Sequence, residues 1–181
     1  MTSIVVRPAD SILSQFAGRI AAIGDRHAHV AFARALNHEG DKGRTQVKRA
    51  LVAQTGIKYG MINRGMKTLR ASYSRLEYTL LQSGGETNLA LFGARQGARG
   101  VSAAPWNVRR VFRSGDGARA SFISPRSGKV LIRSTSASYP LEALFGPNLA
   151  REIVKDESRQ RWEVVPVSLA ARIDHELARL I

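Results

Sequence analysis

The spacing of the apolar residues changes near residue 75, and this change limits the possible folds more than any other feature. Over the first part of the chain, apolar residues recur at every third or fourth position, which predicts amphipathic helices. From residue 75 the period is two, because Leu76, Tyr78 and Leu80 alternate with polar residues, as in a half-buried strand. Helices followed by strands and a closing helix predict an α+β fold rather than a parallel sheet with alternating helices.

Helices are expected over about residues 11–70. The longest helical pattern covers residues 25–55 and contains Gly40 and Gly43. Each glycine costs a helix up to about 1 kcal/mol relative to alanine. The pattern therefore predicts either a break at these glycines or one long, weakened helix. A short helix is expected over residues 57–69.

The middle of the chain is expected to form a small antiparallel sheet over about residues 75–135. A loop or arm rich in Gly, Ala, Ser and Gln interrupts it at about residues 83–106. The turn signals SGDG and PRSG then separate three short apolar runs. Short turns place consecutive strands antiparallel, which predicts a β-meander. Its strands are expected at residues 108–113, 119–124 and 129–135, with the turns at 114–117 and 125–128.

A C-terminal helix is expected over residues 168–181, with Ser168 as its N-cap. The length of 181 residues suits one domain, so residues 1–181 are expected to fold around a single core. The N-terminal apolar run Ile4–Val6 is closed by Arg7, which argues against a signal peptide. No stretch is long enough to span a bilayer. These features predict a soluble protein that is made in a cytoplasm and has no membrane partner.

The stretch SYPLEALFGPNLAREI, residues 138–153, is the most apolar part of the chain that resembles surface sequence. Two prolines and a glycine make it a poor simple helix and a poor simple strand, and the prolines stiffen it. Its large apolar side chains either anchor a neighbouring subunit or fold back onto the core, and both interpretations stay open here. The candidate interface residues are Tyr139, Pro140, Leu141, Leu144, Phe145 and Pro147.

The chain is strongly basic, with 28 Lys and Arg against 14 Asp and Glu and a net charge of +14. Residues 1–135 carry 22 basic and 7 acidic residues, whereas residues 136–181 carry 6 and 7. Such a balance indicates a polyanionic partner, most often nucleic acid, or else a solvated surface. The polyanion-facing part and the apolar segment are expected to be different surfaces. The candidate DNA-facing residues, loosely on one side of a helix, are Lys58, Arg64, Lys67 and Arg70.

No motif supports catalysis, a cofactor or a metal. GMINRGMKT (60–68) departs from the phosphate-binding P-loop, because Met66 separates the second glycine from Lys67. HELAR (175–179) lacks the second histidine of a zinc-protease motif, and the chain has no cysteine. Aromatic residues are only 7% of the chain and do not interleave with the basic ones, which is unlike a base-stacking platform. We therefore expect no enzyme activity, no catalytic residues, no cofactor and no metal.

Four blocks of the sequence, which follow one another along the chain in the family's order, resemble the minor tail protein Z family of tailed bacteriophages, the lambda-type tail completion proteins. The most specific block is the last, in which Tyr-Pro-Leu is followed by an acidic residue and an aromatic-Gly-Pro turn. Some members carry a dense basic run in the arm, which is diluted here to GARQGARG. The blocks are HVAFARALNHEGDKGRTQVKRAL (29–51), TGIKYGMINRGMKTLRAS (55–72), ASFISPRSGKVLIRST (120–135) and YPLEALFGPNL (139–149).

The resemblance implies a structural protein of the virion that acts in tail completion and head–tail joining at the head-proximal end of the tail. It implies three kinds of partner: further copies of the chain in a ring, usually six-fold; neighbouring tail or neck proteins; and DNA along the ring axis, touched non-specifically at most. The protein would assemble in the host cytoplasm. The alternative prediction is a free, non-specific nucleic-acid-binding protein.

Overall fold

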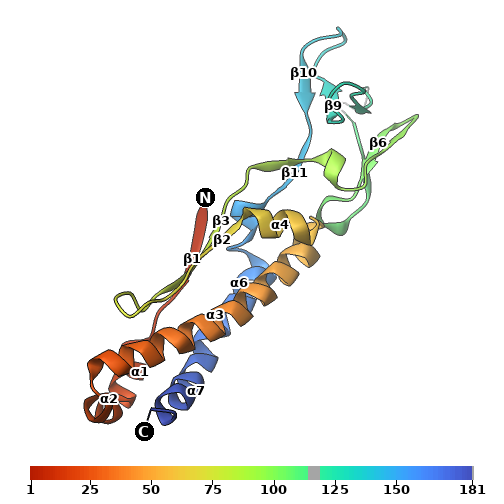
Figure 1. Cartoon of the computed structure of the whole chain (residues 1–181). Coiled ribbons are helices and arrows are strands. Elements are labelled where there is room, and N and C mark those ends of the chain that lie inside the picture. Colours follow the sequence, from red (N-terminus) through yellow and green to blue (C-terminus); the bar gives the residue numbers. More distant parts are fainter. Residues whose placement is uncertain (114–118, 181) are drawn as a thin grey trace.

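The computed structural model describes residues 1–113 and 119–180, and these form an elongated molecule with a helical part and a β-rich end (Figure 1). A long N-terminal helix, several small antiparallel sheets and a C-terminal helix make up the chain. The prediction of an α+β fold is therefore confirmed.

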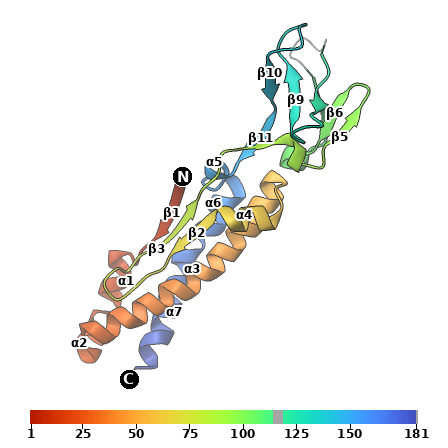
Figure 2. The ribbon, with the colours of Figure 1, turned by 45° about the horizontal axis from the view of Figure 1, so that its top comes forward.

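The chain divides into a body and a β tip. We call residues 1–85 together with residues 149–180 the body, and residues 89–144 the β tip. The strands β4 (Glu86–Asn88) and β11 (Phe145–Asn148) lie between the two parts and pair antiparallel with each other, and we call this pair the joint. Figure 2 shows the β tip beyond the C-terminal end of the long helix α3, with α1 and α2 at the opposite end.

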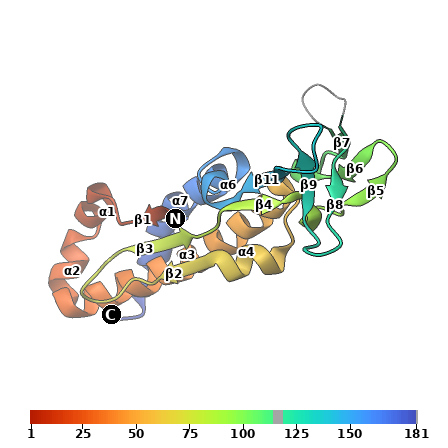
Figure 3. The same ribbon diagram turned by 90° about the horizontal axis from the view of Figure 1, so that it is seen from above.

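The helices of the body are arranged around α3. The helices α6 and α7 pack along it, and α4 packs at its C-terminal end. Seen from above, α6 and α4 lie on opposite sides of α3 (Figure 3). The helices are α1 (Asp10–Gln15), α2 (Ala17–Ile23), α3 (Asp25–Thr55), α4 (Tyr59–Gly65), α5 (Leu149–Glu152), α6 (Asp156–Glu163) and α7 (Val165–Ala178).

The helix α3 is unbroken although it contains Gly40 and Gly43. Both glycines lie where another element approaches closely. A Cβ atom at Gly40 would lie 2.6 Å from ring carbons of Tyr78, and one at Gly43 would overlap Cγ2 of Val165. Of the two possibilities left open by the sequence, the structure has one long helix. The packing that the two glycines permit outweighs their low helix propensity.

The sheet of the body has the strand order β1-β3-β2, with both outer strands antiparallel to β3. Its strands are β1 (Thr2–Val6), β2 (Met66–Leu69) and β3 (Tyr78–Gln82). The prediction of a helix through residue 69 is therefore wrong after Gly65. The hydroxyl and the backbone N–H of Ser83 both donate to the Gly65 carbonyl at 2.9 Å, where the chain leaves α4. Pairing with β3 decides the conformation of residues 66–69.

The loop or arm predicted at residues 83–106 contains regular secondary structure. Three short strands and two 3-10 turns occupy this part of the chain, and several of its apolar residues are buried, among them Leu89, Phe92 and Val101. Burial of these side chains orders a segment in which no hydrophobic period is visible. The elements after β4 are η1 (Leu89–Leu91), β5 (Arg95–Gly97), β6 (Gly100–Ala103) and η2 (Pro105–Asn107).

The predicted single meander is divided between two sheets. The strand β7 pairs with β6 in the order β5-β6-β7, whereas β8 pairs with β9 in the order β10-β9-β8. One isolated antiparallel bridge, Arg113 to Ala120, connects the two regions. The turn predicted at 114–117 lies outside the described residues. The strands are β7 (Arg110–Phe112), β8 (Phe122–Ile123), β9 (Val130–Arg133) and β10 (Leu141–Ala143).

The C-terminal helix α7 begins three residues earlier than predicted, at Val165. Pro166 lies in its first turn, where a missing backbone N–H costs no helical hydrogen bond. Ser168 is therefore inside the helix and is not its N-cap. Ile181, the last residue of the predicted helix, lies outside the described residues. Within the described residues, no helix combines the length and the apolar character that crossing a membrane requires.

Candidate interaction surfaces

The segment 138–153, which we call the docking segment, runs from the β tip through the joint into the body. It forms β10, β11 and α5 in turn. The segment is therefore neither a single helix nor a single strand, as its prolines and glycine predict. Because it is the return path of the chain from the β tip, part of it must pack inside the fold.

Leu144 belongs to the framework of the fold. Its backbone N–H donates to the Val130 carbonyl at 3.0 Å, and its carbonyl accepts from Leu89 N and from Asn88 Nδ2, each at 3.0 Å. The side chain is half-buried against the core. Pro147 is buried as well. These two residues of the predicted interface are therefore part of the internal packing of the chain.

The exposed side chains of the docking segment are Tyr139 and Phe145. Tyr139 is 75% exposed and Phe145 is 47% exposed. Pro140 is exposed, and Leu141 is half-buried and directly opposite Arg133 in the β10–β9 register. Pairing of β10 with β9 therefore places part of the apolar segment beside a basic residue. The expectation that the polyanion-facing part and the apolar segment are different surfaces stays a prediction.

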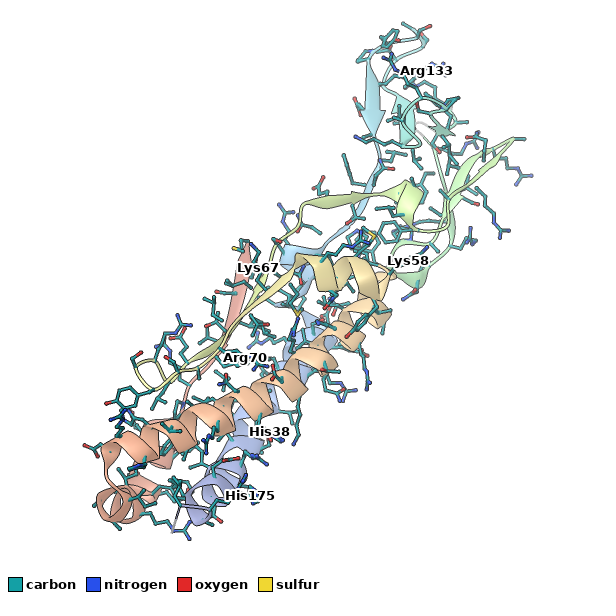
Figure 4. All side chains as sticks on the ribbon, viewed as in Figure 1. His38, Lys58, Lys67, Arg70, Arg133 and His175 are labelled. Atoms are coloured by element: carbon teal, nitrogen blue, oxygen red, sulfur yellow. The ribbon has the colours of Figure 1, made fainter. Side chains whose placement is uncertain are left out.

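The four basic residues predicted on one helix face do not share a helix. Lys58 precedes α4, Arg64 lies in α4, Lys67 lies in β2, and Arg70 follows β2. Figure 4 shows Lys58, Lys67 and Arg70 spread along the molecule. All four side chains are exposed, and the guanidinium of Arg70 is paired with the carboxylate of Asp41. Contact between these residues and DNA stays a prediction.

Arginines in the β tip lie against aromatic rings. The Cζ atom of Arg110 is 5.6 Å from the ring centroid of Trp106 and 5.6 Å from that of Phe112. The Cζ atom of Arg133 is 5.0 Å from the ring centroid of Phe122. The interpretation that aromatic and basic residues do not interleave is thus wrong in the β tip. The run WNVRRVF, residues 106–112, is the sequence signal for this arrangement.

A polar cluster around the buried carboxylate of Glu39 connects α3 with α7. Ser168 Oγ donates to Glu39 Oε2 at 2.7 Å, and Lys42 Nζ donates to Glu39 Oε1 at 2.9 Å. His38 Nδ1 lies 2.8 Å from the same Oε1. Burial alone raises the pKa of Glu39, but the hydrogen bonds from Ser168, Lys42 and His38 outweigh it and hold the pKa below the ordinary 4.5. The cluster stabilises the ionised carboxylate and fastens the two helices together.

The two sequence stretches that depart from known motifs, residues 60–68 and 175–179, are not part of this cluster. The stretch 60–68 forms most of α4 and the start of β2, which is not the strand-loop-helix arrangement of a P-loop. His175 is exposed near the end of α7 (Figure 4). In the part of the chain that the structure describes, no group of three or more His, Asp or Glu side chains could hold a metal ion.

Comparisons with protein-family models, with curated proteins and with solved structures found no match for this chain. The resemblance to the tail completion proteins therefore rests on the four sequence blocks alone.

Proposed function

We propose that this chain is a structural virion protein of a tailed bacteriophage, which acts in tail completion and head–tail joining as a subunit of a ring. The observation that carries the proposal is the exposure of Tyr139 and Phe145, at 75% and 47%, on the docking segment. This segment is also where the sequence most closely resembles the tail completion proteins. Partners would be copies of the chain, expected in a six-fold ring, and neighbouring tail or neck proteins.

Further large apolar side chains are exposed in the same end of the molecule. Proteins that work as monomers rarely expose large contiguous apolar areas. Such side chains in the β tip therefore support contact with another subunit. They are Leu91 (46% exposed), Trp106 (39%), Val108 (59%) and Val111 (49%).

The backbone of the docking segment is already ordered in the single chain. The strand β10 pairs with β9, and β11 pairs with β4, so both sides of Leu144 are fixed by hydrogen bonds. A partner that covers Phe145 or Tyr139 would not have to order this backbone, and the entropy cost of binding would be low. Burial of one such side chain contributes roughly 1.5–3 kcal/mol.

The test compares two sets of substitutions. Tyr139→Ser with Phe145→Ser removes exposed apolar area, and we expect a folded protein that no longer forms the assembled species in native mass spectrometry. Leu144→Asp places a charge at a half-buried position of the framework, and we expect it to lower the thermal transition as well. Val164→Ser with Val167→Ser is the matched control, because these valines are 59% and 79% exposed but lie in the body.

A wild-type chain that stays monomeric at all concentrations, alone and with phage tails, would contradict the proposal. Assembly of the Tyr139 and Phe145 double variant at wild-type concentrations would contradict the role of the docking segment. The alternative function, a free non-specific nucleic-acid-binding protein, predicts a chain that is absent from purified phage particles. The proposal predicts a fixed copy number in them.

No catalysed reaction is part of this proposal. A turnover of ATP, peptide or nucleic acid that is lost on substitution of Lys67 or His175 would contradict it. Thermal stabilisation of the protein by a nucleotide would indicate a nucleotide site at the stretch 60–68 and would also contradict the proposal.

A further inference from the structure

Net positive charge is concentrated in the β tip, because acidic residues are rare there. Residues 89–144 contain nine Lys and Arg against two acidic residues, Asp116 and Glu142. This is a net charge of +7, half of the +14 of the whole chain, on less than a third of its residues. The nine residues are Arg95, Arg99, Arg109, Arg110, Arg113, Arg119, Arg126, Lys129 and Arg133.

The body and the β tip differ in how their basic side chains are neutralised. Every ion pair formed between two described residues lies in the body, for example Arg7 with Glu77 at 2.9 Å and Arg159 with Glu163 at 2.7 Å. The positive charge of the body is therefore partly cancelled within the chain. Among the described residues of the β tip, Glu142 is the one acidic residue, so less of the tip's positive charge is cancelled within the chain.

Some of these arginines are held in place before any partner arrives. The Cζ atom of Arg110 lies over the rings of Trp106 and Phe112, 5.6 Å from each centroid, and that of Arg133 lies over Phe122 at 5.0 Å. A stacked guanidinium keeps the N–H groups at its edge free to form bidentate hydrogen bonds. Stacking also limits the rotamers of the side chain, so less entropy is lost on binding.

Three of the arginines line one hollow of about 300 Å³ in the β tip. Its described lining residues include Arg113, Arg119 and Arg133, together with Ser134 and the carboxylate of Glu142. Eight of the nine basic residues of the tip are arginines, the side chain best suited to the planar, bidentate recognition of phosphate.

We propose that the β tip binds the phosphate backbone of nucleic acid and does not read the base sequence. The excess of basic over acidic residues, arginines beside aromatic rings and the predominance of arginine over lysine carry this inference. The described elements of the tip are short strands and 3-10 turns, with no α-helix to enter a major groove. Trp106, 39% exposed beside Arg110, offers a ring on which a base of a single strand can stack.

The experiment measures fluorescence anisotropy with a labelled duplex and a single strand of the same sequence, over a series of salt concentrations. The tip variant is Arg95→Glu, Arg110→Glu and Arg133→Glu. The matched control is Arg26→Glu, Arg34→Glu and Arg49→Glu, three exposed residues of α3. Both variants change the net charge by the same amount, so only the position of the charge differs.

We expect the wild-type affinity to fall linearly with salt on logarithmic axes, equally for unrelated sequences. The tip variant should lose at least about tenfold in affinity and about 2–3 units of the salt slope, if each arginine contacts one phosphate. The control variant should keep the wild-type slope. Tighter binding of the single strand would assign a role to Trp106, which Trp106→Ala would then abolish, whereas a preference for the duplex would leave the phosphates as the only contact.

Three results would overturn the proposal. The first is a tip variant that binds like the wild type, and the second is an α3 control that loses as much affinity as the tip variant. The third is displacement of the nucleic acid by polyglutamate at equal charge concentration, which would indicate an acidic protein surface as the partner. The variant Arg110→Lys with Arg133→Lys keeps the charge and distinguishes a loss of binding from a folding defect. We expect it to bind nucleic acid more weakly than the wild type while its thermal transition is unchanged.

This binding test does not depend on the proposed assembly, because one chain carries the complete tip. Native mass spectrometry of the tip variant separates the two. Loss of nucleic-acid binding with an intact assembled species concerns only the tip, and a failure of the wild type to assemble concerns only the proposed function. A variant at Lys58 and Arg64, both changed to Glu, tests the surface predicted from the sequence, and it should retain wild-type binding.

Discussion

The close approach of β3 to α3 predicts that Gly40→Ala destabilises the protein, although alanine is the better helix former. A Cβ atom at this position would lie 2.6–2.7 Å from three ring carbons of Tyr78. The ring cannot move away easily, because Tyr78 is fully buried, and its hydroxyl donates to Asp41 Oδ1 at 2.8 Å. Its ring centroid is also 6.1 Å from that of Trp162.

The magnitude follows from two opposing terms. Overpacking a core costs typically about 1–3 kcal/mol, and three simultaneous overlaps place this case at the upper end. Replacement of a helical glycine by alanine gains about 1 kcal/mol. The expected net loss is therefore about 2 kcal/mol in the free energy of unfolding. Gly18→Ala in α2 is the matched control, because nothing lies within 4 Å of its Cβ position, and it should gain about 0.5–1 kcal/mol.

Urea unfolding followed by circular dichroism measures both changes. The same pair should be measured in a Tyr78→Ala background, where the overlap is absent and Gly40→Ala should stabilise as Gly18→Ala does. A Gly40→Ala protein as stable as the wild type would refute the argument. An unchanged penalty in the Tyr78→Ala background would show that the cost has another source.

Three further changes test the polar contacts. The pKa of Glu39 is lowered in the folded state, so the ionised carboxylate stabilises the protein above about pH 4.5, and this stabilisation is lost as the pH falls through the folded-state pKa. Glu39→Gln should remove this pH dependence of the free energy of unfolding, measured by urea unfolding at several pH values. Asn88→Ala removes hydrogen bonds to both backbone groups of Val130 and to the Leu144 carbonyl; we expect a loss of about 2–3 kcal/mol and faster amide exchange of Val130. Tyr78→Phe should cost only about 1 kcal/mol in the same unfolding assay, because it removes one hydrogen bond and no packing.

The helical half was predictable because long stretches of regular spacing carry the signal. The strand β2 was not, since Met61, Ile62, Met66 and Leu69 suit a helix face and only the pairing of Met66 with Gln82 in β3 makes the last two a strand. The strand β1 was not predicted from its short apolar run. Its pairing partner β3 lies more than seventy residues away in the sequence, so neighbouring residues do not reveal the pairing.

The candidate surfaces show the same limit. The docking segment could be recognised by composition, but the division between buried Pro147 and exposed Phe145 depends on β4 and β9, which the segment itself does not encode. The four basic residues were grouped by assuming one helix over residues 57–69, whereas the observed helix α4 ends at Gly65. The arginine and aromatic pairs of the β tip were within reach of the sequence, because Trp106, Arg110 and Phe112 lie in one short run.

The joint has a consequence for how the molecule can change over time. The chain leaves the body at β4 and returns at β11, and these strands are paired neighbours, with Phe145 opposite Asn88 and Asn148 opposite Glu86. The whole β tip is thus one continuous insertion whose two ends lie side by side. Residues can be added, lost or exchanged within it without rerouting the helices beneath. Selection can therefore reshape what the tip recognises while α3 and its partners keep a fixed scaffold, and a tip from a related chain could be grafted at the same two strands.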